Sequence, residues 1–213
     1  AFSARGAGPA PAHEENSVDT LSGLDVGTSS VNAVLLNCEG RTLAMRESRH
    51  PLMTPRPSWA EQNPLDWWNS AQSALRELGE VVREQNHSVL GIGFSGQMNG
   101  AVLLDRALQP VRPCIIWADA RTARECDEIH ARIPPEQLSR ITGKLAVTGY
   151  TAPKLLWVRT HEPAVFESAR HLLLPKDYIR LKLTGELGTD ASDASNTLLF
   201  DLNELCWSAP ILA

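Results

Sequence analysis

Short apolar runs dominate the first hundred residues and predict β-strands. We expect strands at residues 21–26, 31–36, 41–47 and 88–95. The turn-forming residues from Asn37 to Gly40 link the second strand to the third as a hairpin. Because the run at 88–95 is almost wholly apolar, we expect it to be a central strand that is covered on both faces.

A helical repeat of apolar residues follows a proline-rich loop. Residues 51–64 contain four prolines, each of which lacks a backbone donor, so this loop is expected to be irregular. From Asp66 to Val82 apolar residues recur at helical spacing, with charged residues between them, which predicts a long amphipathic helix. Asp66 lies near its start, where a carboxylate favours the free amides and the positive end of the dipole.

The second half of the chain is expected to be mainly helical. Helices are expected at 122–132, 136–142, 153–160, 163–169 and 175–184, and short strands at 101–105, 114–117, 171–174 and 196–202. A hairpin with a third antiparallel strand, followed by alternating helices and strands, predicts an α/β domain with a mixed sheet flanked by helices. The order of elements does not fit a doubly wound sheet.

Composition and charge narrow the set of partners. A formal net charge of −5 and a pI near 5.7 give no basic face, so we expect no nucleic acid and no membrane as partner. No apolar run approaches the roughly 18 residues needed to cross a bilayer. The four cysteines are scattered and include no Cys-x-x-Cys pair, which predicts reduced thiols in a cytoplasmic protein.

Both ends of the chain suggest that it is a piece of a longer protein. The first residue is Ala1, and residues 1–20 mix alanine, glycine, proline and charges without apolar periodicity, which predicts a disordered leader. The last residues, from Trp207 to Ala213, contain no polar tail and no helix cap. We therefore expect one folded unit over residues 21–213.

The first candidate for chemistry is the turn after the first strand, Asp25-Val26-Gly27-Thr28-Ser29. Gly27 lets backbone amides approach an anion closely, and the hydroxyls of Thr28 and Ser29 add donors. A carboxylate beside such a turn would repel a phosphate unless a cation lies between them. Asp25 therefore suggests a magnesium ion that keeps several waters and is bound through Asp25 and phosphates. The same residues also fit an ordinary hairpin with Asp-x-Gly turn chemistry.

Two further segments carry polar and aromatic side chains that suit a sugar. Gln97, Met98 and Asn99 follow the apolar run at 88–95, and ligands of open α/β sheets favour the carboxyl ends of strands. Gln97 and Asn99 offer the donors and acceptors that a polyhydroxylated ligand needs. Trp117 offers an apolar ring face near Asp119 and Arg121. The alternatives are a surface turn for 97–99, and a core tryptophan with a helix-start aspartate for 117–121.

Together these motifs resemble the FGGY carbohydrate kinases. Asp25-Val26-Gly27-Thr28-Ser29 is similar to the first phosphate loop of the actin-like and hexokinase-like ATPases, and residues 149–161 (GYTAPKLLWVRTH) resemble the first signature of the FGGY family. Within the family, the phrases at 59–64, 95–98, 173–178 and 189–195 are similar to the xylulokinase branch. The resemblance covers about residues 22–212.

The resemblance implies two ribonuclease-H-like domains of the actin/hexokinase type, with a cleft between them. This chain would be the N-terminal domain, cut before the second domain, which would hold the general base and most of the adenosine site. Asp25 would be the metal-binding and catalytic residue of this half, and Gly27, Thr28 and Ser29 would lie near the ATP phosphates. The sugar-binding residues would be Gln97, Met98, Asn99, Trp117 and Asp119.

The implied reaction is the phosphorylation of a ketopentose by ATP and Mg²⁺, with D-xylulose as the expected small-molecule substrate. A homodimer of the full-length protein stays open. Asn99 stands where the xylulokinase branch has histidine, and an asparagine binds hydroxyls but takes no charge near neutral pH. Ala118 and Ala120 also depart from the branch. A kinase of another sugar or polyol, or a non-catalytic sugar-binding module, therefore stays open as an alternative.

Overall fold

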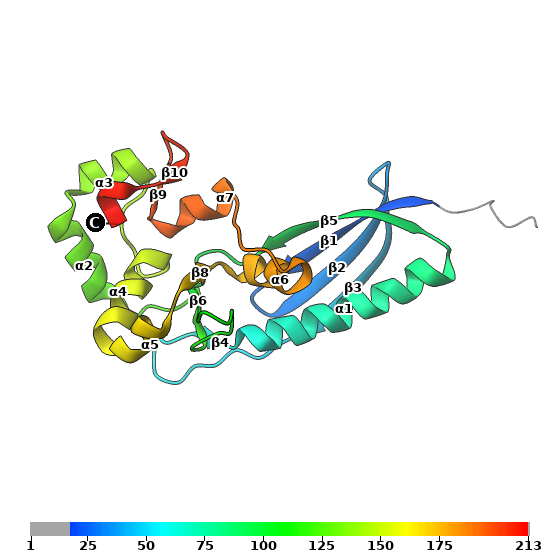
Figure 1. The fold of residues 1–213 in the computed structure, drawn as a ribbon, viewed down its shortest axis with the longest axis horizontal. Coiled ribbons are helices and arrows are strands. Elements are labelled where there is room, and N and C mark those ends of the chain that lie inside the picture. The colour runs from blue at the N-terminus through cyan, green and yellow to red at the C-terminus, as the bar shows by residue number, and fades with distance from the viewer. Residues whose placement is uncertain (1–17, 213) are drawn as a thin grey trace, which may run out of the picture.

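The computed structural model describes residues 18–212 of the chain. The leader expected at residues 1–20 lies, as far as residue 17, outside the described residues. The first strand begins at Asp19, and the hydroxyl of buried Thr20 donates to the Ser88 carbonyl at 3.0 Å. The last residues assigned to the leader are therefore part of the sheet. The molecule is elongated, with this sheet at one end and a mainly helical part at the other (Figure 1).

The main sheet has four strands, in the order β3-β2-β1-β5. These are β1 (Asp19–Val26), β2 (Ser30–Asn37), β3 (Thr42–Arg49) and β5 (Ser88–Gly96). β1, β2 and β3 are antiparallel neighbours, and β5 runs parallel to β1. The expected hairpin turn closes with the Gly40 amide donating to the Asn37 carbonyl at 3.0 Å. The predicted mixed sheet is confirmed.

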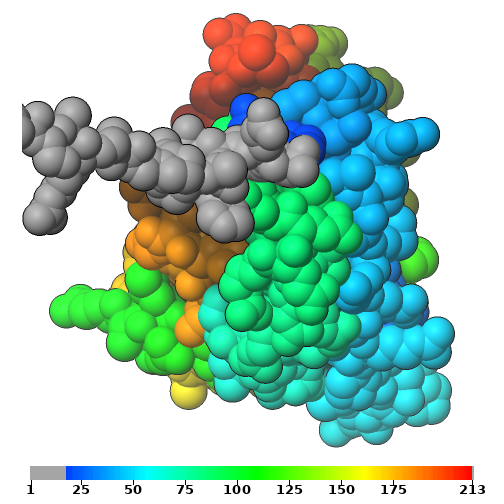
Figure 2. All heavy atoms as spheres, turned by 90° about the vertical axis from the view of Figure 1, so that its right-hand side faces the viewer, coloured from blue at the N-terminus to red at the C-terminus, as the bar shows by residue number. Residues whose placement is uncertain are grey.

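The predicted central position of the 88–95 run is wrong. β5 is an edge strand of the four-stranded sheet, and its apolar side chains Val89, Leu90 and Ile92 are 44%, 61% and 39% exposed. Figure 2 shows this end of the molecule, where the last turns of α1 and the start of β5 (green) lie at the surface beside the β2–β3 hairpin (blue). An apolar run predicts that a strand is buried, but it does not show which element of the fold covers that strand.

The long helix α1 (Pro64–Glu84) covers one face of the sheet and lies across β2 and β3 (Figure 1). It begins slightly before the predicted start, because the Asn63 side chain caps it by accepting from the Leu65 amide at 3.1 Å. Asp66 lies in its first turn, as expected. Its apolar stripe, with Trp67 at its start, packs on the inward-facing residues of β1 and β2. α6 (Pro175–Thr184) lies against β5 and β1.

Short strands connect the sheet to the helical part. β4 (Glu61–Gln62) pairs with β7 (Cys114–Ile115), and β6 (Val102–Leu104) pairs with β8 (His171–Leu173). The helical part consists of α2 (Ala123–Arg132), α3 (Pro135–Thr142), α4 (Thr151–His161) and α5 (Pro163–Ser168), close to the predicted ranges. None of the helices within residues 18–212 combines the length and the apolarity needed to cross a membrane.

The strand predicted at 196–202 is reduced to two residues, and helical turns precede it. α7 (Ala191–Ala194) and the 3-10 helix η1 (Ser195–Thr197) precede the short strand β9 (Phe200–Asp201), which pairs with β10 (Cys206–Trp207) before α8 (Ala209–Leu212). The Asp190 side chain caps α7 by accepting from the Asp193 amide at 3.0 Å. Leu198 has a left-handed φ of 63°, which ends the turn and prevents a continuous strand.

Candidate functional site

Two of the predicted segments meet at the carboxyl ends of β1 and β5. The parallel register pairs Asp25 with Ser95 and Val26 with Gly96. The Gln97 amide then donates to the Val26 carbonyl at 2.8 Å. A Cβ at Gly96 would lie 3.0 Å from that carbonyl, so the close approach of the two chains favours glycine. The turn at 25–29 and the loop at 97–99 therefore lie side by side.

The third predicted segment joins them through a tryptophan. The Trp117 indole donates through Nε1 to the Thr28 hydroxyl at 2.9 Å, although the two residues are far apart in sequence. The Trp117 side chain is 48% exposed, so a large part of its ring faces solvent. A Cβ at Gly149 would lie 3.2 Å from the Trp117 carbonyl, which shows that the turn before α4 packs against the same loop. Trp117 thus borders the turn that carries Thr28.

The buried side chain of Gln62 holds the turn at 25–29 in place. Gln62, which is fully buried, donates to the Thr28 carbonyl at 2.7 Å and accepts from Gln97 Nε2 at 2.8 Å. Trp67 Nε1 donates to the same Gln62 oxygen at 3.1 Å. The His50 amide donates to the Ser29 carbonyl at 3.2 Å, and burial lowers the pKa of the His50 ring. Gln62 was not among the site residues predicted from the sequence. Its signal was the phrase at 59–64.

The loop at 97–99 combines an exposed side chain with two buried amides. Met98 is 49% exposed, whereas Gln97 and Asn99 are buried. Asn99 adopts a left-handed backbone with φ 66°, which asparagine tolerates better than most residues. Gln97 Oε1 and Asn99 Oδ1 have no hydrogen-bond partner among the described residues. An unpaired buried acceptor is unfavourable, but both oxygens are themselves buried, so a ligand hydroxyl can reach them only after the loop moves.

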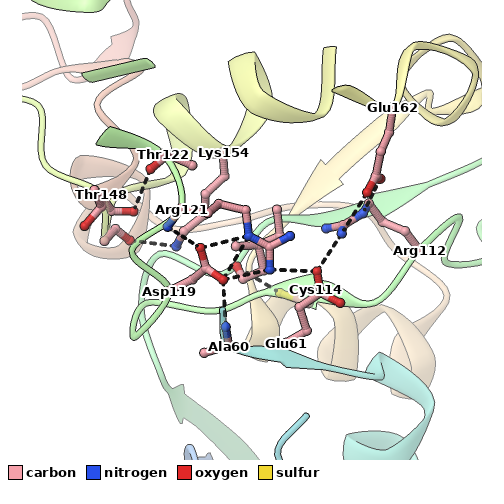
Figure 3. A network of polar contacts seen from close by, with 12 residues as sticks. Ala60, Glu61, Arg112, Cys114, Asp119, Arg121, Thr122, Thr148, Lys154 and Glu162 are labelled. Atoms are coloured by element: carbon pink, nitrogen blue, oxygen red, sulfur yellow. Dashed lines mark hydrogen bonds and ion pairs between the residues drawn. The ribbon is translucent and has the colours of Figure 1, made fainter. Parts of the chain in front are cut away.

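Asp119 does not form part of an open pocket wall. It is 1% exposed, and its Oδ2 accepts from the Ala60 amide at 2.7 Å and from Arg121 Nη2 at 2.7 Å (Figure 3). The Arg121 guanidinium also stacks on Trp59, with Cζ 3.5 Å from the ring centroid. The carboxylate and the guanidinium of the predicted sugar motif therefore satisfy each other in the interior and hold the loop that begins at Trp117.

These two residues belong to a larger buried set of charges, which we call the ion network: Glu61, Arg112, Asp119, Arg121 and Glu162 (Figure 3). Glu61 Oε1 lies 2.8 Å from a nitrogen of Arg112 and 2.8 Å from a nitrogen of Arg121. Arg112 Nε lies 2.8 Å from Glu162 Oε2. Each charge in the network therefore has an opposite charge as a hydrogen-bonding neighbour, as buried charges require.

Asp25 can bind a metal ion, but among the described residues it would be the only protein ligand of that ion. It lies half-buried at the end of β1, beside the tight turn that the Gly27 amide closes by donating to the Ser30 carbonyl at 3.0 Å. A Cβ at Gly27 would lie 3.6 Å from Asp25 Oδ2. Within residues 18–212 no three His, Cys, Asp or Glu side chains are grouped to hold a metal ion. A single carboxylate suits magnesium, which keeps waters and binds phosphates as its other ligands.

Comparison with known proteins places these motifs in a family. Residues 20–213 match the model of the N-terminal domain of the FGGY family of carbohydrate kinases. The chain is 44% identical over 191 residues to the xylulose kinase of Klebsiella pneumoniae and 44% identical over 190 residues to that of Escherichia coli. These matches cover 90% and 89% of this chain but only 39% and 38% of the relatives' own length.

The fold has close counterparts among solved structures. The xylulose kinase of Rhodospirillum rubrum matches with a TM-score of 0.87 and 32% identity, over 91% of this chain and 40% of that chain. The fold is therefore the actin/hexokinase-like fold of the FGGY carbohydrate kinases, with a mixed sheet and flanking helices, as the sequence predicted.

Proposed function

Because this chain belongs to the FGGY family of carbohydrate kinases, we propose that it supplies the sugar-binding half of an enzyme that phosphorylates D-xylulose to D-xylulose 5-phosphate with MgATP. The observation that carries the proposal is the hydrogen bond between Trp117 and Thr28, which unites a sugar-binding segment with a phosphate-binding turn. The 44% identity to xylulose kinases supports a ketopentose as the acceptor.

The sugar side of the site is formed by Trp117 and the loop at 97–99. The half-exposed indole of Trp117 offers an apolar face on which a pentulose chain can lie. Met98 borders the same ligand, and Gln97 and Asn99 would accept from its hydroxyls once the loop moves to expose their unpaired oxygens. We assign Asp119 a positioning role, because its contacts to Ala60 and Arg121 hold the Trp117 loop.

The phosphate side is formed by Asp25, Gly27, Thr28 and Ser29. Bound MgATP would supply the phosphoryl group, with the magnesium ion near Asp25. The Thr28 hydroxyl accepts from Trp117, which leaves its own proton free to donate to a phosphate oxygen. Phosphoryl transfer depends chiefly on positioning and on electrostatic stabilisation. The residues of this chain hold the two reacting groups side by side.

We propose that the general base lies outside these residues, in the part of the relatives that this chain does not cover. Loss of a general base typically lowers the rate by about 10²–10⁴. Loss of the partner that helps to hold both reactants removes up to about 7–11 kcal/mol of barrier reduction. We therefore expect the 213-residue chain to give no measurable ADP from ATP and D-xylulose in a coupled assay. ADP formation by this chain would contradict the proposal that the general base lies outside it.

Sugar binding provides a test that does not need the base. We expect titration calorimetry without nucleotide to detect D-xylulose binding by the chain, and Trp117→Ala to weaken it about 5-fold or more, since aromatic contacts of this kind contribute on the order of 1 kcal/mol or more. Lys182→Met, which changes a half-buried lysine on α6 that lies over the Trp68 ring, is the control and should bind like the unmodified chain. Equal affinity of the Trp117→Ala variant would contradict the proposed site.

A second candidate is a kinase of another sugar or polyol, favoured by Asn99. The asparagine stands where the xylulokinase branch has histidine, and its side-chain oxygen is buried without a partner in the described residues. A panel of pentuloses, hexuloses, glycerol and gluconate, assayed with the full-length protein, separates the two candidates. The highest kcat/KM with D-xylulose supports the first, and a higher value with another acceptor supports the second.

A further inference from the structure

Lys154 is a fully buried lysine whose charge faces backbone carbonyls. It lies in the first turn of α4, and its side chain has no exposed surface. Nζ donates to the Asn99 carbonyl at 2.7 Å and to the Gly149 carbonyl at 2.7 Å. It forms no ion pair with a carboxylate of residues 18–212, unlike the arginines of the ion network. A buried charge without a countercharge in contact is costly, so its presence indicates a specific role.

The first of these carbonyls belongs to the loop assigned to the sugar. Asn99 holds a left-handed backbone, which asparagine tolerates better than most residues but which its surroundings still have to fix. The Thr151 hydroxyl donates to the same carbonyl at 3.2 Å. On the other side, a Cβ at Gly100 would lie only 2.7 Å from Pro175 and 3.0 Å from the Cys114 sulfur. Donors at the start of α4 and close packing beyond Gly100 thus fix the Asn99 peptide.

The second carbonyl belongs to the turn that supports Trp117. Gly149 packs closely on the Trp117 carbonyl, where a Cβ would lie at 3.2 Å. One ammonium group therefore links the loop that carries Met98 to the turn behind Trp117. Figure 3 shows Lys154 beside Asp119, Arg121 and Cys114, next to the residues that anchor the Trp117 loop.

We propose that Lys154, assisted by Thr151, is a positioning residue of the sugar site, which holds the Asn99 peptide and the Gly149 turn so that Met98 and Trp117 border one ligand. Lys154 does not contact the sugar in this arrangement. Its contribution is the relative placement of two loops that come from different parts of the chain. The identity of the ligand rests on the proposed function, whereas the link between the loops rests on the hydrogen bonds of Lys154 alone.

The charge of the Lys154 ammonium group, which links the two loops, changes with pH. Burial lowers the pKa of Lys154 to about 8, and the groups that face it are Cys114 on β7 and, in the loop that follows, Asp119 and Arg121. Burial raises the pKa of the Cys114 thiol to about 12, so the thiol stays neutral near pH 8. Asp119 and Arg121 are paired with each other. Loss of the Lys154 proton therefore replaces two charge-assisted hydrogen bonds by weaker neutral ones.

The first test measures D-xylulose affinity by calorimetry from pH 6.5 to 9.5. In the unmodified chain we expect the Kd to rise several-fold as the pH passes through about 8. Lys154→Met should bind at least about 10-fold more weakly at pH 7, with a Kd that does not change with pH. Lys144→Met is the matched control, because Lys144 also donates to a carbonyl, that of Ser195, in the helical part of the molecule. It should keep both the affinity and its pH dependence.

The second test observes the loop without any ligand. The ¹⁵N shift of the Gly100 amide reports on hydrogen bonding at the preceding Asn99 carbonyl. We expect this shift to titrate with a midpoint near pH 8 in the unmodified chain and in Lys144→Met, and to stay flat in Lys154→Met. Thr151→Val retains the lysine and removes the second donor, so it should displace the shift and keep the titration.

The outcomes separate the two proposals. If the unmodified chain binds no D-xylulose, the proposed function fails, and the Gly100 titration still decides the role of Lys154. A folded Lys154→Met variant that keeps the Gly100 shift and the affinity of the unmodified chain would overturn the positioning role. If that variant does not fold, the titration of the unmodified chain and of Thr151→Val decides, and a flat Gly100 shift between pH 6.5 and 9.5 counts against the proposal.

Discussion

Gly100 is packed so closely that the effect of one added methyl group on stability can be predicted. A Cβ there would lie 2.7 Å from Pro175 Cγ and 3.0 Å from Cys114 Sγ, and both neighbours are parts of packed elements. Gly100→Ala must displace α6 or β7. We expect the free energy of unfolding to fall by about 1–3 kcal/mol, as overpacking usually costs, measured by urea denaturation.

Gly79 provides the opposite case for comparison. It lies within α1, and a Cβ there would meet no atom within 4 Å. Gly79→Ala should therefore raise the free energy of unfolding by about 0.5–1 kcal/mol through the helix propensity of alanine. Equal effects of the two substitutions, in size and sign, would show that the packing around Gly100 is not tight.

Lys154 gives a stability prediction with a defined sign. Burial lowers its pKa from 10.5 to about 8, so between these values the unfolded chain binds more protons than the folded chain. The stability contributed by this residue then rises with pH between about 8 and 10.5, by on the order of 3 kcal/mol in total. Urea denaturation from pH 7.5 to 9.5 should show the unmodified chain gaining stability relative to Lys154→Met. Parallel pH profiles of the two proteins would contradict the lowered pKa.

Residue types at the ends of strands predicted which segments form part of the candidate site. The turn with Asp25 and Thr28, the loop with Met98, and Trp117 were all identified from the sequence, and the structure places these segments side by side. The interior position of Asp119 was not predictable in the same way. Its partner at Ala60 is 59 positions away, and a carboxylate beside an exposed tryptophan looks the same in sequence whether it faces a ligand or a guanidinium.

At the scale of elements, the ion network joins β4, the segment just before β7, the loop that leads to α2 and the junction between α4 and α5. The side chain of Arg121 is 1% exposed and contacts both Glu61 and Asp119. Removal of one partner leaves buried charges uncompensated, so Arg121→Met should lower the free energy of unfolding by about 3–5 kcal/mol in urea denaturation. Arg132→Met provides the control, because Arg132 forms an exposed pair with Glu128 and should contribute less than about 1 kcal/mol. Comparable losses from both substitutions would show that the network does not act as a buried unit.

Most elements were predictable because their signals are local. The apolar stripe of α1 and the proline and glycine at the ends of α6 define these helices within a few residues. The strand predicted at 196–202 is shorter than expected because the 3-10 helix η1 extends to Thr197 and Leu198 adopts a left-handed backbone, neither of which the apolar run reveals. The pairing of β4 with β7 was not predictable, since each strand has only two residues and their partners lie far apart in sequence.

At the scale of the whole molecule, the exposed edge of the sheet predicts self-association. β5 presents Val89, Leu90 and Ile92 at the surface, on a strand with an unpaired edge in the described residues. Such edges pair readily with other chains. We expect the chain to sediment partly as dimers or larger species at micromolar concentration, and Leu90→Lys to shift it toward the monomer.

Leu205→Lys is the control for this effect. Leu205 is 67% exposed, but it lies in a turn and not on a sheet edge. This variant makes the same change of charge and hydrophobicity and should leave the sedimentation profile unchanged. A monomeric unmodified chain, or equal dissociation by both variants, would contradict association through the edge of β5.

The class of fold was predictable for the whole molecule, whereas the position of β5 in the sheet was not. The order of strands and helices along the chain indicates a mixed sheet with flanking helices. Which strand lies at the edge depends on what pairs beside it, and an apolar run at 88–95 carries no information about that neighbour.

The hydrogen bond between Trp117 and Thr28 has a thermodynamic consequence. Under the proposed function, a pentulose that lies on the indole and a phosphate that accepts from the Thr28 hydroxyl would both alter this one hydrogen bond. The affinities for acceptor and nucleotide are then coupled by a single free energy, and each ligand alters the binding of the other by the same factor. Loss of this bond, as in Thr28→Ala, should make the two binding events independent.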